Sequence, residues 1–170
     1  MTQINIQYFK TSFGELILGE FNKQLCMCDW RYRKRRRQID GRLIKGIDAS
    51  FVEKNNDLLD QAKSQLDEYF SYKRQHFNLP VLTVGTDFQK SVWAGLMKIP
   101  FGETSSYLSL AKSISSDKVV RAVGSAIGAN ALSIIIPCHR IIASNGSLGG
   151  YAGGLKTKEK LLNLENDLFN

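Results

Sequence analysis

The sequence is organised around Ile134-Ile135-Ile136-Pro137-Cys138-His139-Arg140, an apolar run that ends in three reactive side chains. Three consecutive β-branched residues predict a short, fully buried strand. Pro137 should end that strand, because proline has no N–H to donate to a sheet. Cys138 would then stand where a buried strand emerges, held by rigid structure yet able to face a cleft. The glycine-rich run 145–154 follows, so a nucleophile, a candidate base, a cation and a loop able to approach a ligand closely are near in sequence.

The composition limits the class of protein. With 170 residues, 43% hydrophobic and 10% aromatic, the chain can form one good domain or two small ones. No run approaches the length of a membrane span, and the N-terminus lacks a signal-peptide pattern. The three cysteines do not form a disulfide framework, so we expect the protein to reside in a reducing cytoplasm. The net charge of +7 favours a polyanionic partner, although a merely soluble basic protein would carry it too.

The sequence pattern of the first part of the chain predicts a small α+β domain. Apolar and polar residues alternate over 4–8, residues 12–14 form a turn signal, and 16–18 and 25–28 indicate further strands of an antiparallel meander. Residues 55–72 carry apolar side chains at helical spacing. We therefore expect one domain over residues 1–76, a linker over 77–86 and a second domain over 87–170.

Two features of the first part have more than one interpretation. The basic run 31–37 could contact DNA phosphate or form a solvated loop, and the loop is favoured because like charges repel. Cys26 and Cys28 could begin a metal site, but the only other candidate ligand away from Cys138 is His76, too few for closed zinc coordination. We expect both cysteines to pack as hydrophobes and predict no metal site.

The second part of the chain predicts mostly helices. Asp87 can cap a helix over 88–99, Thr157 can cap a last helix over 157–168, and a pair of short helices over 107–114 and 118–129 lies between them. The tight turn at 115–117 makes this pair a helix-turn-helix pattern.

The outer face of the second short helix is almost bare. Arg121 is its one long cation, among Gly124, Ser125 and Gly128, opposite an apolar face. A major-groove reader would need several long polar side chains, whereas small residues suit close approach to the minor groove. The glycines could instead allow close packing against a neighbouring helix.

A lone cysteine beside an apolar strand is usually a buried hydrophobe, so the flanking motifs decide its interpretation. Three motifs accompany one another: Arg121-Ala122-Val123-Gly124 with Asn130, then Pro137-Cys138-His139-Arg140, then Tyr151-Ala152-Gly153-Gly154. From about residue 88 to 165 this pattern resembles the active-site region of the O6-alkylguanine-DNA alkyltransferase family. The resemblance implies a ribonuclease-H-like N-terminal domain and a C-terminal domain with a winged-helix-like helix-turn-helix.

The resemblance also implies an activity. In that family a protein cysteine takes the alkyl group from O6-alkylguanine, and also from O4-alkylthymine in some cases, in one irreversible step without a cofactor. The implied partner is double-stranded DNA, bound by a monomer through the minor groove. Arg121 would replace the extruded base, on a DNA-binding face with Ala122, Gly124, Ser125 and Gly128. Extrusion is needed because O6 is out of reach inside the duplex.

The thiol needs activation, because an ordinary cysteine is mostly protonated at neutral pH. Neighbours on an extended segment point apart, so we do not expect a direct bond between Cys138 and His139. The resemblance implies that a water bridges the two and that Glu165 orients the imidazole. Taken alone, Glu165 would be a surface residue.

The remaining site residues also follow from the resemblance. Tyr107, otherwise a core aromatic, would push the target phosphate and donate to the base. Backbone carbonyls of Cys138 and Ile141 would accept from the guanine amino group, Tyr151 would form a wall, and the Ala152 N–H would donate to O6. Asn130 would brace the active-site turn, although Ala131 stands where the family usually has proline. Arg140 would hold backbone or a domain contact rather than substrate.

Two other classes of function remain at this stage. A thiol hydrolase using Cys138 and His139 would need an oxyanion hole and turnover. A helix-turn-helix regulator or damage sensor would need no chemistry, and the sensor relatives of the family lack the cysteine.

Overall fold

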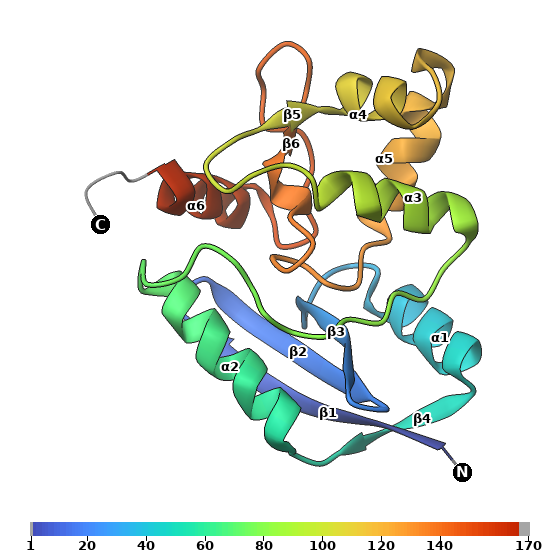
Figure 1. The fold of residues 1–170 in the computed structure, drawn as a ribbon, viewed down its shortest axis with the longest axis vertical. Helices are drawn as coiled ribbons and strands as arrows, with labels where there is room; N and C mark the ends of the chain where they lie inside the picture. The colour runs from blue at the N-terminus through green and yellow to red at the C-terminus, as the bar shows by residue number, and fades with distance from the viewer. Residues whose placement is uncertain (1, 167–170) are drawn as a thin grey trace. The chain divides into compact units, whose positions relative to one another are not determined.

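The computed structural model describes residues 2–166, which form two compact units that divide between Gly85 and Thr86 (Figure 1). Unit 1 holds a sheet with two helices, and unit 2 is mostly helical. The predicted α+β class is therefore confirmed. No helix among the described residues is long and apolar enough to cross a membrane.

Unit 1 is built on a four-stranded sheet of order β3-β2-β1-β4. Its strands are β1 Thr2–Thr11, β2 Gly14–Phe21, β3 Gln24–Trp30 and β4 Ala49–Glu53. The three consecutive strands pair antiparallel, which confirms the predicted meander, while β4 pairs parallel to β1. Sequence periodicity missed β4, a short edge strand.

Helix α2, Asp57–Phe70, packs on strands β1 to β3 of unit 1. The Asn56 side chain caps it by accepting from the Leu59 N–H at 2.9 Å, which satisfies one of the free donors at a helix start. Its buried residues are Leu59, Ala62, Leu66 and Tyr69. The predicted apolar stripe is therefore the face that covers the sheet.

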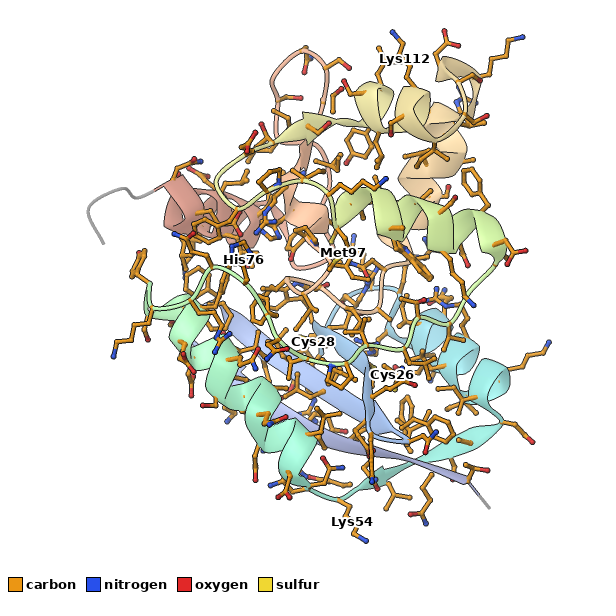
Figure 2. All side chains as sticks on the ribbon, viewed as in Figure 1. Cys26, Cys28, Lys54, His76, Met97 and Lys112 are labelled. Atoms are coloured by element: carbon orange, nitrogen blue, oxygen red, sulfur yellow. The ribbon has the colours of Figure 1, made fainter. Side chains whose placement is uncertain are left out.

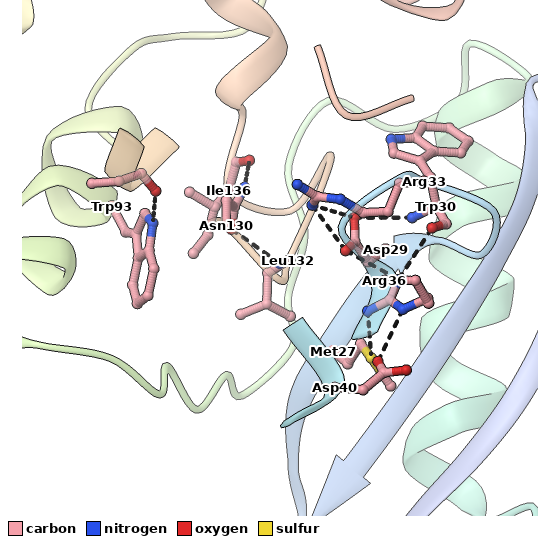
Figure 3. Close-up of polar contacts among 11 residues, drawn as sticks. Met27, Asp29, Trp30, Arg33, Arg36, Asp40, Trp93, Asn130, Leu132 and Ile136 are labelled. Carbon is pink, nitrogen blue, oxygen red and sulfur yellow. Dashed lines mark hydrogen bonds and ion pairs between the residues drawn. The ribbon is translucent and has the colours of Figure 1, made fainter. Parts of the chain in front are cut away.

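The sequence favoured a solvated loop for the basic run 31–37, and the structure contradicts this prediction. Helix α1, Arg36–Ile47, begins inside the run. Arg33 and Arg36 reach the fully buried carboxylate of Asp29 at 3.0 and 3.2 Å, and Arg36 also bonds Asp40 at 2.9 Å (Figure 3). A buried carboxylate is strongly destabilising unless it is paired, so the run anchors α1 to β3. Lys34, Arg35 and Arg37 remain exposed.

Most of the predicted linker 77–86 belongs to unit 1. The Leu25 N–H donates to the Pro80 carbonyl at 2.8 Å, and the Leu82 N–H donates to the Leu25 carbonyl at 2.9 Å. The segment through Gly85 is thus fixed along β3 by backbone hydrogen bonds.

The described part of unit 2, residues 86–166, forms four helices and two short 3-10 turns. They are α3 Asp87–Leu96, α4 Tyr107–Ile114, η1 Asp117–Val119, α5 Val120–Gly128, η2 Cys138–Arg140 and α6 Leu155–Asn166. The predicted helix-turn-helix is the pair α4 and α5. The residue that caps α3 is Thr86, in a capping box with Gln89, and not Asp87. Helix α6 begins two residues before Thr157, and its predicted end at residue 168 lies outside the described residues.

Helices α4 and α5 of unit 2 pack closely against α3. A Cβ added at Gly95 would lie 2.8 Å from Leu110 of α4, so this glycine allows close approach of the two helices. On the other side, the Trp93 indole donates to the Ala126 carbonyl of α5 at 2.9 Å. Val123 and Ala126 are buried, so the apolar face of α5 is turned inward as predicted.

The predicted strand at 134–136 is instead a buried turn. Ile134 has φ 72°, a left-handed conformation that β-branched residues rarely adopt, and the Ile136 N–H returns to the Leu132 carbonyl at 2.8 Å. A short apolar run shows only that a segment is buried. Its backbone path here is decided by contacts with the rest of unit 2.

Candidate active site around Cys138

Asn130 holds the turn that leads into Cys138. Its side-chain amide donates to the Ile136 carbonyl at 3.1 Å and accepts from the Leu132 N–H at 2.9 Å (Figure 3). The Cys138 N–H in turn donates to the Ile136 carbonyl at 2.7 Å. A single buried amide thus fixes both sides of the turn and stabilises the unfavourable backbone of Ile134. Ala131, buried in the turn, fills the position at which proline was expected.

Cys138, His139 and Arg140 form the 3-10 turn η2 and not an extended segment. All three side chains are buried, with Cys138 5% exposed and His139 fully enclosed. The tight turn points successive side chains in different directions, and the contacts of His139 and Arg140 both lead to α6.

Glu165 of α6 receives both of these side chains. His139 Nε2 lies 2.7 Å from Glu165 Oε2, and Arg140 donates from Nε to Oε1 at 2.8 Å and from Nη2 to Oε2 at 3.0 Å. Arg140 Nη1 also donates to the Ile99 carbonyl at 2.7 Å. The family resemblance implied that Glu165 orients His139 but gave Arg140 only a backbone or domain role. Its forked pairing with Glu165 depends on tertiary structure.

Burial and the charges of Glu165 and Arg140 determine which ring nitrogen of His139 carries the proton. Burial alone would raise the pKa of Glu165, but hydrogen bonds from His139 and Arg140, with their charges, bring it down to about 2. Burial lowers the pKa of His139, against the opposing effect of Glu165. A neutral imidazole beside an ionised carboxylate donates from Nε2, so Nδ1 carries the free lone pair. Among the described residues Nδ1 has no hydrogen-bond partner, although it is buried.

Lys158 of α6 is a site residue that the sequence analysis missed. Its side chain is fully buried, and its ammonium donates to the carbonyls of Ile141 at 2.5 Å, Gly150 at 3.2 Å and Leu148. Burial lowers its pKa to about 8, with the charge of Cys138 acting in the opposite direction. One sequence signal could have found it: residues 158, 161 and 165 fall on one helical stripe, so this lysine lies among inward-facing positions.

Tyr107 opens α4, after Ser106, whose hydroxyl caps the helix by accepting from the Ser109 N–H. Its ring lies against the glycine-rich loop, since a Cβ added at Gly149 would be 3.1 Å from the Tyr107 hydroxyl. Burial, followed by the charge of Cys138, raises the pKa of Tyr107. The tyrosine therefore remains a neutral hydroxyl at physiological pH.

The other predicted substrate residues border the same group. Ile141 follows η2 and begins β6, Ile141–Ile142, which pairs with β5, Ser105–Ser106. The Tyr151 ring lies edge-on to His139 with their centroids 6.4 Å apart, and Ala152 next to it is half-buried. Tyr107 and Tyr151 thus come from distant parts of the sequence to the surroundings of Cys138.

The outer face of α5 is open. Arg121, Ala122 and Ser125 are exposed, while Gly124 and Gly128 are half-buried. A Cβ added at Gly124 would meet, among the described residues, only the Tyr107 ring at 4.0 Å, an ordinary contact. Close helix packing inside unit 2 therefore does not explain Gly124, in contrast to Gly95 of α3.

Comparison with protein families matches nearly the whole chain. Residues 4–83 match a family described as 6-O-methylguanine DNA methyltransferase, ribonuclease-like domain, and residues 87–167 match the DNA binding domain of the same methyltransferase. The chain belongs to the O6-methylguanine DNA methyltransferase family. The resemblance inferred from the motifs around Cys138 is confirmed.

Individual members of this family match most of the chain. The chain is 42% identical over 158 residues to the methylated-DNA–protein-cysteine methyltransferase of Methanosarcina barkeri, covering 93% of this chain and 94% of the relative. It superposes on the crystal structure of the Mycobacterium tuberculosis O6-methylguanine methyltransferase with a TM-score of 0.80, at 32% identity, over 96% and 93% of the two chains. A structure of the M. tuberculosis OGT in complex with DNA matches equally well, over 96% and 92%.

The other two cysteines of this O6-methylguanine DNA methyltransferase family member have no comparable environment. Cys26 and Cys28 are buried in β3, and His76 lies exposed after α2 (Figure 2). Burial raises the pKa of Cys26 to about 12 and that of Cys28 further still. The described residues contain no cluster of side chains that could hold a metal ion. Both thiols are packing residues of unit 1, in agreement with the sequence interpretation.

Proposed function

We propose that this protein repairs DNA by moving the alkyl group of O6-alkylguanine onto Cys138, once per molecule. The observation that carries the proposal is the buried His139–Glu165 pair directly after Cys138 in the turn η2, in a chain whose family is that of the O6-methylguanine DNA methyltransferases. O4-alkylthymine is a second candidate substrate, because it presents an alkyl group on an equivalent exocyclic oxygen.

The proposed chemistry starts with removal of the thiol proton. Glu165, held ionised by Arg140, keeps the Nε2 hydrogen of His139 in place, so that the lone pair of Nδ1 can accept a proton. A water between this nitrogen and the Cys138 sulfur would carry it. The buried Nδ1, which finds no hydrogen-bond partner within residues 2–166, supports such a relay, because buried polar atoms are almost always hydrogen-bonded in the working state.

Alkyl transfer then follows as a single displacement. The Cys138 sulfur forms a bond to the alkyl carbon while the carbon–O6 bond breaks, and the electron pair remains on the guanine, which takes up a proton. Nucleophile and leaving group exchange the alkyl group directly, so the step needs no cofactor. The thioether product does not hydrolyse, and the molecule reacts once.

The surroundings of Cys138 supply recognition of the base. We assign the Tyr151 ring to one wall, the Ala152 N–H to guanine O6, and the carbonyls of Cys138 and Ile141 to the guanine amino group. Tyr107, with its hydroxyl kept neutral, would donate to the base and press on the target phosphate. Asn130 would hold the turn in the reactive geometry.

Double-stranded DNA is the proposed partner, with α5 entering the minor groove. Arg121, exposed among small residues, would fill the space of the extruded base, and Ala122, Gly124, Ser125 and Gly128 would allow the backbone to approach. Since the alkylated base is paired badly, its extrusion costs less than that of a normal base. All of these groups lie in residues 87–166.

We propose that the protein acts as a monomer in the reducing cytoplasm, where Cys138 stays a thiol.

Intact mass spectrometry tests the proposal. Protein mixed with excess duplex DNA containing O6-methylguanine should gain one methyl group, about 14 Da, on the Cys138 peptide, and methyl loss from DNA should stop at one equivalent. Cys138→Ser should gain nothing while still binding DNA, because an alcohol is far less ionised than a thiol. Repair beyond one equivalent would indicate a turning-over hydrolase. DNA binding without any methyl gain by the wild-type protein would indicate a regulator or sensor.

A further inference from the structure

We propose that Lys158 is a positioning residue of the guanine site, whose ammonium joins the Ile141 carbonyl to the loop 148–150 and so sets the distance between the group that binds O6 of the base and the group that binds its amino group. The inference rests on the proposed function and adds a residue that none of the motifs around Cys138 contains.

The bonding of Lys158 is unusual for a lysine. Its side chain is 0% exposed, and within the described chain all of its hydrogen bonds go to backbone carbonyls, those of Ile141, Leu148 and Gly150. An ammonium group has three N–H donors, and here each can be given one acceptor. Because a buried charge is destabilising unless it is fully hydrogen-bonded, the three carbonyls and the ammonium hold one another in place.

The loop is also held from its other side. Gly149, between the two carbonyls that Lys158 binds, has φ 72° and faces the Tyr107 ring, where a Cβ would lie 3.1 Å from the hydroxyl. The start of the loop is closed by the Ala143 N–H, which donates to the Ser147 carbonyl at 2.9 Å. Residues 148–150 are therefore contacted by Lys158, through the Leu148 and Gly150 carbonyls, and by Tyr107, at Gly149.

This clamp lies directly beside the groups assigned to guanine. Gly150, which Lys158 binds, immediately precedes Tyr151 and Ala152, the proposed wall and the proposed donor to O6. The Ile141 carbonyl is the proposed acceptor for the guanine amino group, and it has two lone pairs. Lys158 occupies one of them and fixes the direction of the other. A single side chain thus connects recognition of O6 with recognition of the amino group.

The experiment separates base positioning from the reactivity of the thiol, because the Lys158 charge also acts on Cys138. Two rates are measured for each protein: methyl transfer from O6-methylguanine in duplex DNA, and alkylation of the Cys138 peptide by iodoacetamide, which needs no base recognition. Any change in thiol ionisation enters both rates and cancels in their ratio. The variants are Lys158→Met and Lys158→Arg, and the matched control is Lys156→Met, an exposed lysine of the same helix.

Lys158→Met should lower the ratio of methyl transfer to iodoacetamide alkylation by about 10- to 100-fold, as expected when reacting groups are misplaced by about 1 Å. Lys158→Arg should lower it as well, because a planar guanidinium cannot direct one nitrogen at three carbonyls. Lys156→Met should leave it unchanged. Circular dichroism and thermal unfolding establish which variants are folded at the assay temperature.

A merely structural lysine would lower the melting temperature without moving the ratio in the folded variant, and that result would overturn the inference while leaving the proposed function intact. If Lys158→Met does not fold, Lys158→Arg decides by the same criterion. Failure of both variants to fold would assign Lys158 to the stability of the fold and would also overturn the inference. Absence of methyl transfer by the wild-type protein would instead refute the proposed function.

Discussion

Replacement of Glu165 by glutamine tests the charge arrangement behind Cys138. The carboxylate accepts one hydrogen bond from His139 and two from Arg140, all in a buried setting. Glutamine has the same shape, but its NH₂ group replaces one acceptor oxygen and its side chain carries no charge. Arg140 would then be left buried without a counter-charge, which destabilises the folded state.

The pKa of Glu165 gives the size of the effect and its dependence on pH. That pKa is about 2 in the folded protein, against 4.5 ordinarily. A depressed folded pKa contributes stability that is present above the unfolded pKa and is lost as pH falls toward the folded one. The contribution is therefore about 3 kcal/mol at pH 6 and only about 1 kcal/mol at pH 3. The stability gap between wild type and Glu165→Gln should close by about 2 kcal/mol between these two pH values.

The assay is urea unfolding at pH 6, 5, 4 and 3, followed by Trp93 fluorescence in a Trp30→Phe background, because the chain has two tryptophans and Trp93 is the one in unit 2. The matched control is Glu159→Gln, an exposed glutamate of the same helix, for which the gap should stay near zero throughout. Glu165→Gln should also slow methyl transfer, since the His139 tautomer is no longer fixed. A stability gap that is equal at pH 6 and pH 3 would show that Glu165 is not held ionised by His139 and Arg140.

Three further predictions concern DNA and the active-site turn. Arg121→Ala should slow repair of duplex DNA strongly and reaction with free O6-benzylguanine much less, because only the duplex requires extrusion; equal losses in the two single-turnover rates would remove Arg121 from that role. The logarithm of the DNA affinity should fall linearly with the logarithm of salt concentration, with weak dependence on base sequence, as measured by fluorescence anisotropy. A strong preference for one operator would favour a regulator instead. Asn130→Ala should lower the free energy of unfolding of unit 2, measured in urea, by about 1–3 kcal/mol, because the Leu132 N–H and the Ile136 carbonyl each lose a buried partner. A change below about 0.5 kcal/mol would mean that the turn is stable without the Asn130 side chain.

Local periodicity identified most of the secondary structure. Alternation over residues 4–8 and the turn signal at 12–14 predicted the meander of unit 1, and caps with helical spacing predicted α2, α3, α4 and α5. These features depend on neighbours in sequence, which a single chain displays. The boundaries of these helices were off by up to three residues: α3 is capped by Thr86 and not by Asp87, and it ends at Leu96 and not at Ile99. Strand β4 was missed because five residues at a sheet edge carry too little pattern.

The sequence by itself determined the motifs: a thiol after an apolar run, a helix face around Arg121 with few long side chains, and a glycine-rich run that follows the thiol. It could not determine the path of residues 134–136, since burial of three isoleucines is compatible with a strand or with the turn that Asn130 imposes. Nor could the sequence show that Arg33 and Arg36 pair with Asp29. The repulsion among neighbouring basic side chains is visible in the sequence, whereas the buried carboxylate that compensates it is brought close only by the fold. The same holds for Arg140 with Glu165 and for Lys158 with its three carbonyls. A buried charge takes its role from the groups that surround it in space, and only the tertiary structure brings those groups together.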